Sequence, residues 1–142
     1  MRIKLNKYFY LDEFVSPFIY NMYGASSIWF VAKPIIEAAF HLRTMFGPTI
    51  INDWYDGGDR MWSGFRDSSC TIGALNSFHK HGKAFDSIYK DANIEDVKKY
   101  VINNHKIFNA FGITAMEANS SNWLHLDCRN VPNSNSILLV NG

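Results

Sequence analysis

Cysteine, excess charge and long apolar runs are all scarce in this chain of 142 residues. The two cysteines, Cys70 and Cys128, form no CxxC pair, which excludes the common zinc-finger and thioredoxin motifs. Fourteen Lys and Arg face thirteen Asp and Glu, and this balance argues against nucleic-acid binding by counterion release. No apolar run approaches the roughly 18–20 residues that a membrane helix needs. We therefore expect neither a nucleic-acid partner nor a membrane partner.

The composition indicates a globular chain, with 47% hydrophobic and 19% charged residues. We find no repeat, low-complexity tract or linker, so we predict a single domain over residues 1–142. The first residues include basic side chains, but no apolar stretch of signal-peptide length follows them. We therefore expect no signal peptide and a reduced state for both cysteines.

Apolar periodicity and turn residues predict an α+β fold with a short, mostly antiparallel sheet and flanking helices. One helix is expected within 28–46, with Pro34 in its first turn and Gly47 as its stop. A second helix should begin at an Asn93 cap and end near Asn104. Short strands are expected at 49–52, 61–65, 84–89, 113–116, 123–127 and 137–140.

Histidines and carboxylates are spaced so that the fold could bring them together in a catalytic metal site. His79 and Asp86 lie seven residues apart, and Gly82 allows the chain to turn between them. Trp123, His125 and Asp127 alternate and should share one face of a strand. If the loop and the strand meet, two imidazoles and one carboxylate form a zinc-type ligand set. Spacing alone favours the alternative, in which His79 and His81 are surface residues of the loop and His125 is a buried, hydrogen-bonded strand residue.

Three ordered motifs resemble the LAS-type zinc peptidases, a family of D-alanyl-D-alanine carboxypeptidases and phage L-alanyl-D-glutamate endopeptidases that includes the hedgehog signalling domain. Residues 77–86 match the S-x-H-x-x-G-x-A-x-D signature, 63–66 resemble S-G-[YF]-R, and 123–127 resemble W-x-H-x-D. Residues 8–14 and 51–54 are most similar to small phage and prophage members. The resemblance implies a hedgehog/DD-peptidase-like fold and Zn²⁺ bound by His79, Asp86 and His125.

The resemblance also implies catalytic roles for residues outside the ligand set. Arg66 would hold a substrate carboxylate or stabilise the oxyanion, because its planar guanidinium pairs well with either. Many family members have a Glu three residues before the last ligand, but here that residue is Asn122. Glu117 is the nearest candidate base if 113–116 and 123–127 form a hairpin. Asp127 could orient an imidazole, or it could bond Arg66 or Arg129.

The expected activity is zinc-dependent hydrolysis of a peptide bond in the stem peptide of peptidoglycan, by a phage endolysin or a virion-associated lysin. Such a protein would be found in the host cytoplasm before release or in the virion, and would act at the bacterial cell wall. Asn122 favours an alternative, a non-catalytic structural or binding subunit among phage virion proteins. A metal-dependent nuclease is a weaker alternative, suggested by His79, His81 and Asn76. The bond that is cut stays open.

Overall fold

The computed structural model describes residues 1–133 and 135–142, and these form a mixed α+β structure. No helix of the described part is long and apolar enough to cross a membrane. Short 3-10 turns supplement the α-helices, among them η2 (Gly24–Phe30) and η4 (Phe78–His81). The described α-helices are α1 (Pro17–Tyr23), α2 (Lys33–Phe46), α3 (Ile94–Asn103) and α4 (His105–Phe111). The described strands are β1 (Thr49–Ile50), β2 (Ala84–Tyr89), β3 (Ala115–Glu117), β4 (Leu124–Asp127) and β5 (Leu138–Val140).

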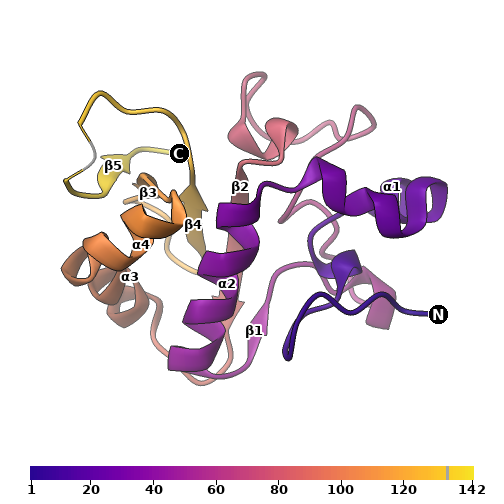
Figure 1. Cartoon of the computed structure of the whole chain (residues 1–142), viewed down its shortest axis with the longest axis horizontal. Coiled ribbons are helices and arrows are strands. Elements are labelled where there is room, and N and C mark those ends of the chain that lie inside the picture. The colour runs from indigo at the N-terminus through magenta and orange to yellow at the C-terminus, as the bar shows by residue number, and fades with distance from the viewer. Residues whose placement is uncertain (134) are drawn as a thin grey trace.

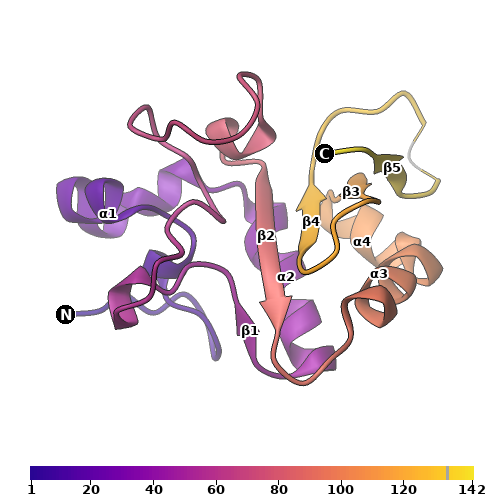
Figure 2. The same ribbon diagram turned by 180° about the vertical axis from the view of Figure 1, so that it is seen from behind.

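The described strands form one sheet in the order β1-β2-β4-β3-β5. Three of its pairings are antiparallel, and β5 pairs parallel to β3. This confirms the predicted short, mostly antiparallel sheet with flanking helices. Figure 1 shows α2 lying in front of β2, and Figure 2, from behind, shows the sheet in front of α2. The helix therefore covers one face of the sheet.

Helix α2 forms the cover because its apolar residues recur on one side. Its buried residues follow the spacing of one helical face, and Gly47 ends the helix with a φ of 80°. Pro34 stands in the first turn, as predicted. The face packs against sheet residues that are fully buried, including Phe85, Leu124 and Leu126. The buried helix residues are Ile35, Ala38, Ala39 and Leu42.

The structure differs from the sequence-based prediction in three places. One predicted strand is absent, one helix was not predicted, and one helix begins later than expected. Residues 61–65 form no strand, because their backbone bonds to scattered partners: the Asn52 side chain accepts from Ser63, and the Phe14 carbonyl accepts from Phe65. Helix α4 was not predicted, since it follows α3 after Asn104 alone. Ile28 belongs to η2, which ends before α2 begins.

Candidate metal centre

The pairing of β2 with β4 brings the first two candidate ligands together. Asp86 and His125 are register partners in this antiparallel pair, so both side chains lie on the same face of the sheet. Their neighbours Phe85 and Leu126 point to the opposite, buried face towards α2. Oδ1 of Asp86 lies 2.8 Å from Nδ1 of His125. Strand alternation thus separates the core face of the sheet from a polar face.

The third candidate ligand, His79, is held by a short capped turn. Ser77 caps η4 by accepting from the backbone N–H of His79. Gly82 closes the turn with a φ of 67°, and a Cβ at this position would overlap the carbonyl oxygen of Phe30. Strand β2 then begins at Ala84, two residues before Asp86. The Ser and Gly of the 77–86 motif therefore cap and close the turn that places His79 beside Asp86.

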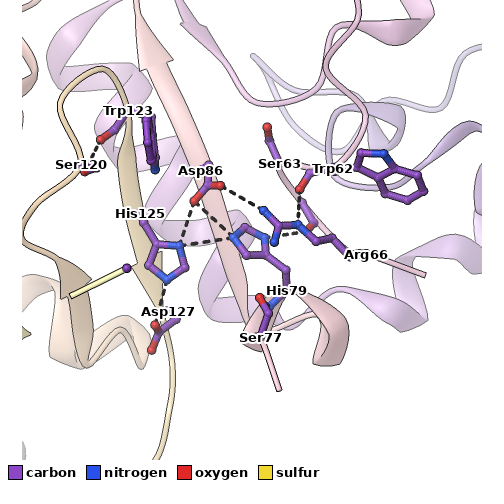
Figure 3. Close-up of polar contacts among 12 residues, drawn as sticks. Trp62, Ser63, Arg66, Ser77, His79, Asp86, Ser120, Trp123, His125 and Asp127 are labelled. Atoms are coloured by element: carbon purple, nitrogen blue, oxygen red, sulfur yellow. Dashed lines mark hydrogen bonds and ion pairs between the residues drawn. The ribbon is translucent and has the colours of Figure 1, made fainter. Parts of the chain in front are cut away.

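His79, Asp86 and His125 converge at one point, as predicted, and could hold a metal ion (Figure 3). Nε2 of His79 lies 3.2 Å from Oδ1 of Asp86 and 3.3 Å from Nδ1 of His125. With metal–ligand bonds of about 2.0–2.1 Å, two ligands of a tetrahedral zinc ion are separated by about 3.3 Å. The two separations from His79 match this value, whereas the 2.8 Å between Asp86 and His125 is shorter. Three ligands would leave a fourth position for water.

The hydrogen bonds on the outer side of each imidazole fix which nitrogen faces inward. Nδ1 of His79 lies 2.9 Å from the carbonyl oxygen of Gly64, which can only accept, so Nδ1 carries the proton. Nε2 of His125 likewise donates to the Asp127 carboxylate over 3.0 Å. In the neutral imidazoles, both inward nitrogens therefore present lone pairs, opposite a carboxylate oxygen of Asp86. Three acceptors that face one another need a proton or a metal cation between them.

The electrostatics of the site follow from this crowding of acceptors. Burial opposes the charge on His125, but hydrogen bonds to Asp127 and Asp86 outweigh burial and raise the pKa of His125 to about 9. Burial also opposes ionisation of Asp86, yet hydrogen bonds from the two histidines hold the pKa of Asp86 well below its usual range. The site therefore keeps its carboxylate ionised and attracts positive charge.

Asp127 supports His125 from behind and is paired with Arg129, one of the two partners considered from the sequence. Asp127 is fully buried. Nε and Nη2 of Arg129 donate to its two oxygens over 2.8 and 2.6 Å. Burial opposes ionisation, but hydrogen bonds from Arg129 and His125 lower the pKa of Asp127 to about 2. This ion pair orients the ligand imidazole from outside the metal position.

Arg66 and Glu117, the predicted catalytic residues, both line a cavity of about 400 Å³ together with the three candidate ligands. Nε of Arg66 donates to the carbonyl of Trp62 over 2.8 Å, and Nη2 lies 3.4 Å from Asp86. Glu117 ends β3, on the sheet face of His125, because its neighbour Met116 pairs with a residue of the buried face. Asn122 is exposed to solvent in the loop between β3 and β4.

The structure also places two further histidines, the two cysteines and Trp123. His81 is exposed, and His41 is structural, with Nε2 2.8 Å from the Tyr100 hydroxyl. Cys70 and Cys128 are both free thiols, as expected. Trp123 lines two cavities that adjoin the three candidate ligands.

Sequence analysis did not identify two groups that support His79 and the β3–β4 loop, because neither group has a recognisable sequence pattern. The carbonyl of Gly64, which fixes the His79 proton, is a backbone group that any residue would supply. Lys98 of α3 is buried and donates to the carbonyls of Ala118 and Ser120 in the β3–β4 loop. In the sequence, Lys98 stands among polar and apolar residues of a helix, where a lysine is ordinarily exposed, so its burial could not be predicted.

A second hollow of about 520 Å³ lies along α2, away from the three ligands. Its walls include Ile36, Phe40 and Met45, with His41 and Glu37 as its ionisable groups. This largely apolar hollow offers no group of converging ligands. The candidate ligands and the predicted catalytic residues therefore lie together on the polar face of the sheet.

No family model, no curated protein and no solved structure matches this chain.

Proposed function

We propose that this protein is a zinc-dependent peptidase of the LAS type, on a hedgehog/DD-peptidase-like fold, that hydrolyses a peptide bond in the peptidoglycan stem peptide. The observation that carries the proposal is the convergence of three acceptor atoms from His79, Asp86 and His125. Two imidazole nitrogens and one carboxylate oxygen are a ligand set that suits Zn²⁺, and two of their three separations fit a tetrahedral ion. The protein would act at the bacterial cell wall, as a phage endolysin or a virion-associated lysin.

The three ligands would hold the ion, and the surrounding residues divide the remaining work. When bound there, zinc would polarise the scissile carbonyl and lower the pKa of a water molecule towards neutrality. The carboxylate of Glu117 accepts the proton of the attacking water and returns it to the leaving amine nitrogen. Glu117 lines the same cavity as His79 and His125, which supports this role over one for the exposed Asn122.

Arg66 is suited to bind negative charge beside the ligands. Its side chain is only 12% exposed and is held by the Trp62 carbonyl and by Asp86. A guanidinium fixed in this way can pair with a substrate carboxylate or with the oxyanion that develops on the scissile carbonyl. Because it is already ordered, little further entropy is lost when substrate binds.

The test is release of new amino groups from purified peptidoglycan by the zinc-loaded protein, measured by amine labelling and mass spectrometry. The Glu117→Gln variant should keep its zinc and lose about 10²–10⁴-fold in rate, the usual contribution of a general base. Glu37→Gln, on the remote face of α2, is the matched control and should retain full activity. If the zinc-loaded protein releases no amino groups, the proposal fails, and the virion-subunit alternative on the same fold is favoured.

A further inference from the structure

A short segment of the chain, residues 140–142, forms part of the wall of the candidate site. These residues line the same cavity of about 400 Å³ as Glu117 and the two candidate histidines. Strand β5 pairs parallel to β3, with Val140 as the register partner of Glu117. Figures 1 and 2 both show the end of the chain marked C beside β3 and β4. The segment therefore follows the edge of the sheet and passes the proposed general base.

Two hydrogen bonds fix this segment to the loop that follows β3. The N–H of Ala118 donates to the carbonyl of Val140 over 2.8 Å. The N–H of Gly142 donates to Oδ1 of Asn119 over 3.0 Å. Both leucines of β5 are about half exposed, and so are poorly buried against the fold. A segment held by a few hydrogen bonds at an exposed edge opens more easily than the core of the sheet.

Gly142 lies directly against the carboxylate of Glu117. A Cβ at Gly142 would overlap both carboxylate oxygens, so no further heavy atom fits between the two residues on this side. The N–H of Gly142 is directed to Asn119 and not to the carboxylate. The contact therefore covers the carboxylate without donating a hydrogen bond to it. A general base needs a water molecule or a leaving group within about 2.6–3.2 Å, and the covered side of Glu117 has no room for either.

We propose that residues 140–142 form an autoinhibitory strap, which covers the carboxylate of Glu117 in the resting protein and moves aside when a substrate binds. This inference rests on the proposed function and concerns the regulation of the same site. Strap and substrate compete for one space, so the apparent affinity falls with the fraction of molecules in which the strap is open. Saturating substrate displaces the strap and leaves the same catalytic groups. The strap therefore raises KM and leaves kcat unchanged.

The first test loosens the strap and needs no catalysis. Asn119→Ala, in an exposed loop, removes the side-chain acceptor that anchors the strap. Amide hydrogen exchange should become about two- to tenfold faster at Ala118, as expected for one lost hydrogen bond. Exchange at Thr114, whose N–H bonds to β4, should stay the same. Asn103→Ala, at the exposed end of α3, is the matched control. Unchanged exchange at Ala118 in the Asn119 variant would overturn the assignment of the strap.

The second test measures how the zinc-loaded proteins release amino groups from peptidoglycan that has been solubilised by cutting its glycan chains. Asn119→Ala should lower KM about two- to tenfold at unchanged kcat, and Asn103→Ala should match the parent. An equal KM in Asn119→Ala and the parent would overturn the inference and leave the proposed peptidase function intact. A lower kcat at unchanged KM would also overturn it, because the strap would then orient Glu117 and not cover it. If the parent releases no amino groups, the proposed function fails, and the inference fails with it.

Discussion

Replacing Asp127 with Asn should weaken zinc binding although Asp127 does not contact the metal position. The carboxylate accepts from Nε2 of His125 with one oxygen while Arg129 donates to both oxygens. An amide has one acceptor and one donor group, so it cannot satisfy both partners. If its oxygen faces His125, its NH₂ faces the guanidinium of Arg129, donor against donor.

The opposite orientation of the amide is just as unfavourable for the site. Its NH₂ then faces Nε2 of His125 and favours the tautomer with the proton on Nδ1, the atom that points at His79 and Asp86. That proton has to leave before a metal ion can bind. Loss of such a supporting partner typically weakens metal binding 10–100-fold, which corresponds to about 1.4–2.8 kcal/mol.

The assay is competition for zinc against a chromophoric chelator at fixed pH. Asp127→Asn should shift the dissociation constant 10–100-fold, whereas Asp91→Asn, at an exposed turn, should leave it unchanged. Denaturant unfolding of the metal-free proteins would show how much of the effect is lost stability. An Asp127→Asn variant that binds zinc within twofold of the parent would refute the assigned roles of Asp127 and His125.

Three further predictions concern pH, loop anchoring and the ligand turn. Because the pKa of His125 is raised to about 9 and zinc needs the deprotonated nitrogen, zinc affinity should rise about tenfold per pH unit from 6 to 9 and then level off, as titrations at several pH values would show. Lys98→Met should destabilise the fold by about 2–4 kcal/mol in denaturant melts by leaving two carbonyls without a donor, whereas exposed Lys99→Met should change stability by less than about 0.5 kcal/mol. Gly82→Ala should lower the free energy of unfolding by about 3 kcal/mol or more in the same melts, since φ is positive and a Cβ would overlap a carbonyl oxygen. An unchanged midpoint for Lys98→Met would contradict its bonds to the loop carbonyls, and an unchanged midpoint for Gly82→Ala would contradict the close approach at the turn.

The parts of the fold that sequence predicted best are those where local signals and tertiary packing agree. Strand β2 was predicted with its observed bounds, because its alternation is set by one core face and one polar face. Asn93 caps α3 as expected, through its side chain and the N–H of Glu95. Residues 61–65 looked like a strand by composition, but Trp62 lines a cavity and Gly64 supplies a carbonyl to His79.

The part of the candidate site that could be predicted is the part that depends on side-chain identity and spacing in the sequence. The convergence of His79, Asp86 and His125 was predicted, and the structure brings them together. The choice of Arg129 over Arg66 as the partner of Asp127 depends on where the chain travels after β4, which spacing does not encode. The two cavities depend on the path of the loop that follows Arg66, and no local pattern describes that path.

The most direct test of the central claim is the zinc content of the purified protein, measured by elemental mass spectrometry. The account predicts about one zinc per chain, loss of that zinc in His79→Ala, and its retention in His81→Ala, whose exposed imidazole lies two residues away. Absence of zinc after incubation with the metal, or equal zinc in His79→Ala and the parent, would contradict it.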